Sequence, residues 1–237
     1  MNYYYITGTS RGIGKAVAET LLKKEDNIVY GISRNHVLKH QNYHPITLDL
    51  LDLEKVKQFR FGDHPDAGKV VFVNNAGVLG HVTQVGRMYD DKIIQSYHIN
   101  IVSPSVLINQ FIHQYQDDQM EKMILNTSSG AARHTIPSWS TYVATKSGIE
   151  MFLRTIQDEQ QDFKHPFRIF SVAPGVVDTE MQDEIREVEH ENFRELDRFV
   201  RLKKEGKLVD PRDVGKKFAD IMEHPENYPD NFMDLRD

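Results

Sequence analysis

A phenol and an amine stand four residues apart at Tyr142 and Lys146. On a helix, residues with this spacing lie on one face about one turn apart. An unperturbed tyrosine has a pKa of about 10, and a nearby ammonium group lowers it by favouring the phenolate. The pair therefore predicts a site for proton transfer near neutral pH, although this spacing taken alone is also typical of a surface pair.

A glycine-rich turn follows the first apolar run of the chain. It reads Thr7-Gly8-Thr9-Ser10-Arg11-Gly12-Ile13-Gly14 and opens a helical pattern predicted over Ile13–Lys24. Glycines let the backbone turn tightly and approach a ligand closely. The helix N-terminus then offers free N–H groups and the positive end of its dipole to a pyrophosphate. A tight turn that binds nothing is the alternative for this motif alone.

Further polar motifs follow other predicted strands: Asp49-Leu50, Asn74-Asn75-Ala76-Gly77, Ser128-Ser129-Gly130 and Pro174-Gly175-Val176-Val177-Asp178-Thr179. Separately, each is also compatible with an ordinary capped turn. Together with Thr-Gly-x-x-x-Gly-x-Gly and Tyr-x-x-x-Lys, in this order, they resemble the short-chain dehydrogenase/reductase family. Within it, the segments around Ser129, Trp139 and Thr179 are most similar to sepiapterin reductase-like and benzil reductase-like NADPH-dependent carbonyl reductases.

The resemblance implies roles for the matching residues. It makes Tyr142 the general acid, Lys146 the group that lowers its pKa, and Ser129, thirteen residues before the tyrosine, the hydroxyl that polarises a substrate carbonyl. It implies that Asn100 organises a long helix and a proton relay, and a kink in that helix is an equal alternative. The residues implied to bind the cofactor are Gly8, Ser10, Arg11, Gly12, Ile13, Gly14, Ser33, Arg34, Asp49, Leu50, Asn75, Ala76, Gly77, Tyr142, Lys146, Pro174, Gly175, Val177 and Thr179.

Two arginines predict which nicotinamide cofactor is used. Ser33-Arg34 stands about twenty residues past the turn, where a NAD site holds an acidic residue and a NADP site a basic one. Arg11 can supply a second cation to the same phosphate, because guanidinium groups suit phosphate oxygens. The sequence thus predicts NADPH (NADP+), with a solvated surface charge as the alternative for either arginine.

Short apolar runs alternate with helical patterns along the whole chain. The predicted strands are Tyr3–Thr7, Ile28–Ser33, Ile46–Leu48, Val70–Asn74, Met123–Thr127 and Phe167–Ala173, with a possible last strand within Asn231–Asp237. Between Glu54 and Gly68 the crossover helix is expected to be reduced. This pattern predicts an α/β, Rossmann-type doubly wound, mostly parallel sheet of about seven strands with helices on both faces and ligands at the carboxyl ends of the strands.

No linker or repeat divides residues 1–237, so we predict a single dinucleotide-binding and catalytic domain. The segment at about 179–207 differs from the rest of the chain in composition, because it is densely charged with residues of both signs. Its apolar residues have spacings compatible with one helical face; they are Ile185, Val188, Phe193, Leu196 and Val200. We predict a peripheral helical substrate lid, with a solvated helix as the alternative.

Composition excludes several function classes. Lys+Arg 29 against Asp+Glu 35 gives a net charge of −6, which argues against nucleic acid as a partner. The absence of cysteine excludes disulfides, thiolate zinc sites and a cysteine nucleophile, and fits a cytoplasmic protein. No apolar run reaches the roughly 18 residues of a membrane span. His36, His40 and His44 lack acidic or thiolate companions, so no metal site is predicted.

The predicted reaction is NADPH-dependent reduction of a ketone to an alcohol, favouring a vicinal diketone or an α-hydroxyketone as the small-molecule substrate. The alternatives are a 3-oxoacyl thioester or sugar-alcohol oxidoreductase of the same family, and a non-catalytic NADPH-binding regulatory protein. The complete set of Ser129, Tyr142 and Lys146 argues against the last. Trp139, one turn before Tyr142, suits either an aromatic substrate wall or the core. By family resemblance we expect a homo-oligomer, a dimer through the helices of Asn100 and Tyr142 rather than a tetramer.

Overall fold

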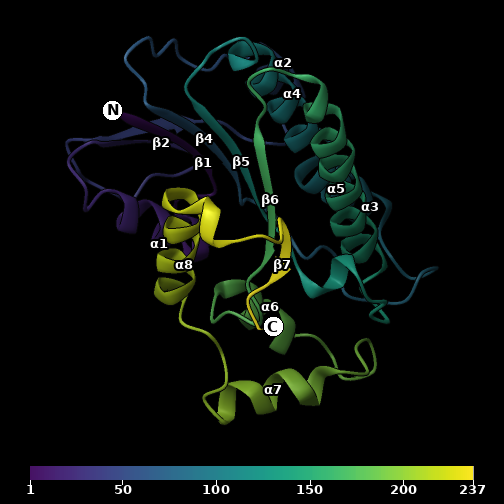
Figure 1. The fold of residues 1–237 in the computed structure, drawn as a ribbon. Helices are drawn as coiled ribbons and strands as arrows, with labels where there is room; N and C mark the ends of the chain where they lie inside the picture. Colours follow the sequence, from purple (N-terminus) through teal and green to yellow (C-terminus); the bar gives the residue numbers. More distant parts are fainter. Residues whose placement is uncertain (237) are drawn as a thin grey trace.

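The computed structural model describes residues 1–236, in which seven strands form one parallel sheet. The strands are β1 (Asn2–Thr7), β2 (Asn27–Ser33), β3 (Tyr43–Thr47), β4 (Lys69–Asn74), β5 (Glu121–Thr127), β6 (Arg168–Ala173) and β7 (Phe232–Asp234). Their spatial order is β3-β2-β1-β4-β5-β6-β7 (Figure 1). The strand order reverses direction between β1 and β4, the place where such sheets open a ligand-binding crevice. The predicted doubly wound α/β fold is confirmed.

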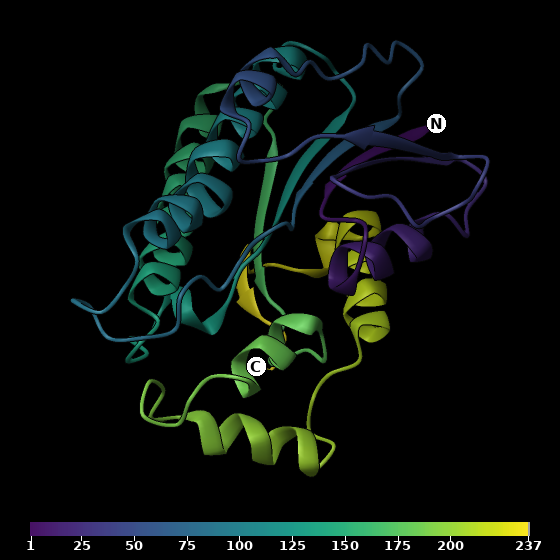
Figure 2. The same ribbon diagram turned by 180° about the vertical axis from the view of Figure 1, so that it is seen from behind.

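Helices cover both faces of the sheet. The first face carries α1 (Gly12–Leu21) and α8 (Pro211–Glu223), and the other carries α2 (Leu53–Gln58), α3 (Asp90–Tyr97), α4 (Ser103–Tyr115) and α5 (Ser140–Glu159) (Figures 1 and 2). Residues Val70 to Val73 of β4 are fully buried. A strand covered on both faces needs apolar side chains in both directions, which explains the unbroken apolar runs in the sequence.

The helix before β5 is interrupted in its middle. Residues His98–Val102 form a π-helical turn that joins α3 to α4 without a break in the chain. A π-helical turn inserts one extra residue into the helix, and such insertions occur frequently at functional sites. Asn100 lies in this turn and is buried.

The segment predicted as a lid contains two short helices, α6 (Glu180–Arg186) and α7 (Leu196–Lys204), beyond the carboxyl ends of the strands (Figure 1). The prediction of one continuous helical face is wrong. The chain between α6 and α7 is not helical, and Val200 is 42% exposed while Phe193 and Leu196 are buried. The apolar side chains of both helices and of Phe193 between them nevertheless pack in one hydrophobic cluster.

Several predicted boundaries also shift. The first helix ends at Leu21 instead of Lys24, and the third strand is Tyr43–Thr47 instead of Ile46–Leu48. Pro45 therefore lies inside a strand, which is tolerated because β3 pairs only with β2 at the edge of the sheet. The reduced helix α2 and the short last strand β7 agree with prediction. Single turns of 3-10 helix occur at Gly130–Ala132, Gln160–Asp162 and Pro225–Asn227.

Candidate active site

A cavity of about 650 Å³ lies at the carboxyl ends of the strands. Residues following β1, β2, β3, β4, β5 and β6 line it, and α6 and α7 contribute its far wall. All of the predicted site residues line this cavity except Gly14 and Asn100. One pocket thus brings together residues as far apart in the chain as Gly8 and Arg236.

The glycine-rich turn has the geometry of an anion-binding site. Gly8 and Gly12 have φ values of +77° and +56°, which side chains other than glycine rarely adopt. A Cβ on Gly14 would lie 2.4 Å from the carbonyl oxygen of Gly8, so this glycine allows close packing and does not line the cavity. Neither a capping side chain nor an acidic residue covers the first turn of α1. Its N–H groups are therefore available to a dinucleotide phosphate.

Asn75 joins the ends of three strands. Its Nδ2 donates to the carbonyl oxygen of Thr7 (2.9 Å), and Thr127 Oγ1 donates to its Oδ1 (3.2 Å). The Thr7 hydroxyl accepts hydrogen bonds from the backbone N–H groups of Asn75 and Ala76 (2.9 and 3.0 Å). This network holds the ends of β1, β4 and β5 together under the cavity, which Asn75, Ala76 and Gly77 all line.

The structure brings the predicted proton-transfer residues together. Tyr142 and Lys146 are 6% and 8% exposed on α5, and the Tyr142 hydroxyl is hydrogen bonded to Ser129. The N–H of Ala131 donates to Ser129 Oγ (3.2 Å), which leaves the hydroxyl proton of Ser129 free to be donated. Ser129 and Tyr142 can therefore both hydrogen bond to a single substrate oxygen.

The pKa values differ from the expectation that Lys146 lowers the pKa of Tyr142. Burial raises the pKa of Tyr142, and the hydrogen bond from Ser129 reverses this only in part. Burial also lowers the pKa of Lys146 to about 8. The Lys146 amine donates to the carbonyl oxygen of Thr127 (2.8 Å) and lies 5.8 Å from the centre of the tyrosine ring. Desolvation is thus the largest influence on both pKa values, and the phenol is protonated at neutral pH.

The Asn100 side chain forms hydrogen bonds with the backbone beside the cavity. Its Oδ1 accepts from the N–H of Val78 (2.9 Å) and its Nδ2 donates to the carbonyl oxygen of Val78 (2.8 Å) and to Thr145 Oγ1 (3.1 Å). The side chain therefore joins the π-helical turn to α5 and to the loop after β4. Both predicted roles of Asn100, in organising the helix with its proton relay and in a helix kink, stay predictions.

The two arginines predicted at the cofactor phosphate have different surroundings. Arg34 is exposed and lines the cavity. Arg11 also lines it, but its Nε lies 2.7 Å from a carboxylate oxygen of Glu180 and its guanidinium 3.9 Å from Glu184. Arg11 therefore links the glycine-rich turn to α6. No local pattern in the sequence could have indicated a contact between residues this far apart.

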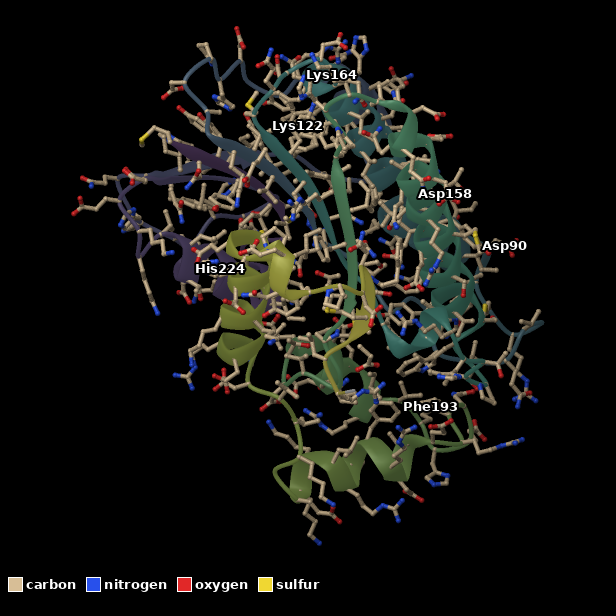
Figure 3. All side chains as sticks on the ribbon, viewed as in Figure 1. Asp90, Lys122, Asp158, Lys164, Phe193 and His224 are labelled. Atoms are coloured by element: carbon tan, nitrogen blue, oxygen red, sulfur yellow. The ribbon has the colours of Figure 1, made fainter. Side chains whose placement is uncertain are left out.

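Aromatic side chains form the wall next to Tyr142. Trp139 is buried, with its ring 5.6 Å from Tyr142 in an edge contact, 5.3 Å from Phe193 in a stacked contact and 5.4 Å from Phe199. Figure 3 labels Phe193 beside the α6–α7 region. Trp139 belongs to a core cluster and also lines the cavity, so its role as a wall for an aromatic substrate stays a prediction. Other lining residues that the sequence did not single out are Ile136, Met181, Gln182, Glu195, Arg198, Phe199 and Arg236.

The three histidines with regular spacing are used structurally. His36 contacts the hydroxyls of Tyr43 (3.3 Å) and Thr47 (3.2 Å), and His44 lies in β3. Within residues 1–236, no three metal-ligating side chains are placed to share an ion. In the same range, no helix has both the length and the apolar character to cross a membrane.

A doubly wound sheet with a phosphate-binding turn at its switch point, and a hydroxyl, a phenol and an amine in the same cavity, is typical of a dinucleotide-dependent oxidoreductase. A family model described as short chain dehydrogenase matches residues 2–190. The chain belongs to this family, which confirms the resemblance inferred from the motifs, and it is an oxidoreductase with a nicotinamide cofactor.

Similar proteins cover almost the whole chain. A benzil reductase ((S)-benzoin forming) of Bacillus cereus is 34% identical over 95% of this chain and 96% of its own length. A protein of the same name from Bacillus subtilis (strain 168) is 31% identical over 94% of each chain. Among solved structures, the short chain dehydrogenase/reductase YIR035C of Saccharomyces cerevisiae has a TM-score of 0.86 at 27% identity, covering 100% of this chain and 97% of that one.

Proposed function

We propose that this protein uses NADPH to reduce a ketone whose neighbouring carbon also carries oxygen, with a vicinal diketone as the favoured class. The observation that carries this proposal is the meeting of Ser129, Tyr142 and Lys146 in the cavity that also contains the glycine-rich turn. Two relatives named benzil reductase, each similar over 94% or more of this chain, support the substrate class. Benzil is itself an aromatic vicinal diketone, and the aromatic wall at Trp139 and Phe199 suits such a compound.

The chain's own residues perform the acid–base part of this reaction. NADPH held at the glycine-rich turn would supply a hydride to the carbonyl carbon. Ser129 donates a hydrogen bond to the carbonyl oxygen, and Tyr142 transfers its proton to that oxygen. Because burial raises the pKa of Tyr142, the phenol carries the proton that this step needs. The ammonium form of Lys146 then stabilises the phenolate that remains.

The segment of α6 and α7 serves in this proposal as the substrate lid of a single catalytic domain. Its support is that Met181, Ile185 and Phe199 line the cavity from these two helices. Closing them over a bound ketone excludes water from the reacting atoms and strengthens the hydrogen bonds of Ser129 and Tyr142.

Loss of NADPH absorbance with purified protein tests the function. The panel contains benzil, butane-2,3-dione, benzoin, a 3-oxoacyl thioester and an aldose. We expect benzil to be turned over most efficiently and Tyr142→Phe to lower kcat by about 10³-fold while NADPH still binds, because one general acid contributes about 10²–10⁴-fold. A preference for the thioester or the sugar would support those alternative substrate classes. NADPH binding without turnover of any compound would support a regulatory role.

We also propose that two copies of the chain associate through the outer face of α3 and α5. Ile94, Tyr97 and Met151 are exposed large apolar side chains on these helices, and exposed apolar groups of this kind are typical of association surfaces. Sedimentation equilibrium tests this part. We expect a dimer, and a shift to monomer for Met151→Glu; a wild-type monomer would contradict it.

A further inference from the structure

Three successive turns of α5 contact three successive residues at the end of β5. Tyr142 is hydrogen bonded to Ser129, and the amine of Lys146 donates to the carbonyl oxygen of Thr127 (2.8 Å). Glu150, one turn further along the same helix face, accepts a hydrogen bond from the hydroxyl of Ser128 (2.7 Å). The reaction proposed above gives roles to Ser129, Tyr142 and Lys146 but none to Glu150.

Glu150 is an unusual residue to bury. It is only 5% exposed, and an ionised carboxylate away from water is costly unless it is paired and hydrogen bonded. Its Oε1 lies 3.4 Å from Arg133 Nε and 3.2 Å from Arg154 NH2, while Oε2 takes the bond from Ser128. Oε1 is therefore paired with two guanidinium groups and Oε2 with a hydroxyl group. These contacts fix the orientation of the carboxylate.

These contacts fall on both sides of Ser129 in the chain. Ser128 precedes it, and Arg133 follows the 3-10 turn Gly130–Ala132 whose N–H at Ala131 donates to Ser129 Oγ. Because a carboxylate only accepts, the Ser128 hydroxyl donates its proton to Glu150. Ser128 is also held by its N–H bond to the carbonyl oxygen of Val172 (2.8 Å). The backbone around Ser129 is thus fixed to the helix that carries Tyr142.

We propose that Glu150 is a positioning residue that sets the Ser129 hydroxyl against Tyr142 by holding Ser128 and Arg133. The inference rests on the proposed function, because it concerns the hydroxyl that binds the substrate oxygen. Small displacements of such a group have large effects, since a misplacement of about 1 Å can cost about 10²-fold in rate. A residue with a merely structural role would instead destabilise the protein without acting through Ser129.

Glu150→Gln tests this role, because it keeps the shape of the side chain and one acceptor oxygen while removing the charge that binds both arginines. We expect kcat for ketone reduction to fall about tenfold, with the KM for the ketone and the Kd for NADPH unchanged. Glu159→Gln is the matched control, since it removes the same charge from an exposed position in the last turn of α5. We expect its kcat to match the wild type.

A double-mutant cycle with Ser129→Ala decides how Glu150 acts. If Glu150 works through Ser129, Glu150→Gln lowers kcat by less than about twofold once Ser129 is alanine. An equal loss in both backgrounds, or no loss in the wild-type background, would overturn the proposal. If Glu150→Gln does not fold, Ser128→Ala replaces it in the same cycle, because that change leaves both ion pairs intact.

Amide hydrogen exchange tests the positioning role of Glu150 independently of the proposed reaction. In Glu150→Gln we expect faster exchange of the amides of Ala131, Ala132 and Arg133, which hydrogen bond within the Ser129 turn, while the β4 amides are unchanged. This result requires no substrate. Unchanged exchange in the turn would overturn the positioning role even with full ketone reductase activity. Faster exchange without any turnover would retain the coupling of Glu150 to the turn and reject the proposed reaction.

Discussion

The glycine-rich wall of the cavity and the wall made by α6 and α7 are held in place by different forces. At the turn, backbone geometry and short hydrogen bonds determine position, as the 2.9 Å bond from Asn75 Nδ2 to Thr7 shows. At α6 and α7, side chains determine the position of the wall, because Phe193 and Phe199 pack on Trp139. Exposed ion pairs such as Arg11–Glu180 add little to its stability. The first wall is suited to holding a constant ligand, and the second to admitting and releasing a variable one.

The largest effect is expected where the turn meets its first helix. A Cβ on Gly14 would lie 2.4 Å from both Gly8 O and Asn75 Nδ2, so Gly14→Ala should lower the free energy of unfolding by about 2 kcal/mol and weaken NADPH binding. Urea denaturation and cofactor titration measure the two effects. Gly68→Ala is the control, because its Cβ would find only ordinary contacts at 3.7 Å. Equal unfolding free energies and NADPH affinities for the two variants would contradict the conclusion that backbone geometry fixes the glycine-rich turn.

The next effect concerns the choice of cofactor at the same wall. Arg34→Asp should shift the ratio of kcat/KM for NADPH over NADH toward NADH by more than about tenfold, because a charge-assisted hydrogen bond contributes about 1.5–3 kcal/mol. Lys39→Asp, an exposed cation outside the cavity lining, is the control. An unchanged ratio in Arg34→Asp would remove this arginine from the phosphate site.

A smaller and more local effect is expected at the other wall. Phe193→Ala removes a fully buried ring between Trp139 and Phe199. If this wall moves independently, the KM for the ketone should rise about tenfold while the Kd for NADPH and the urea midpoint hardly change. Steady-state kinetics and urea denaturation of one preparation measure both. A large drop in the midpoint would show instead that the two walls unfold together.

The smallest effect is a shift in the pH dependence of the reduction rate. Burial lowers the pKa of Lys146 to about 8, so the ammonium form and the reduction rate should decrease as the pH rises through that value. In Lys146→Arg the charge persists, because guanidinium stays protonated in this range, and the decrease should move to higher pH. The midpoint of the kcat profile is the readout. The same midpoint in both proteins would assign the decrease to another group.

The sequence predicted the first wall better than the second, for physical reasons. Gly8, Asn75 and Thr179 follow strand ends, and parallel strands bring such ends to one edge of a sheet whatever the distant side chains are. The separation of α6 from α7, the exposure of Val200 and the pairing of Arg11 with Glu180 depend on packing between remote segments, for which periodicity carries no signal. At Asn100 the sequence predicted a helix kink as one alternative, but no local pattern distinguishes the π-helical turn found there from an α-helix.

Both ends of the sheet are poor templates for adding another strand. At one end β3 contains Pro45, which lacks an N–H, and at the other end β7 has only three residues. Chains released from the ribosome at high concentration are therefore protected against edge-to-edge pairing and the aggregates that follow from it. At one edge this protection depends on Pro45. Pro45→Val would add a backbone N–H donor to the edge strand β3 and make it a better template for another strand.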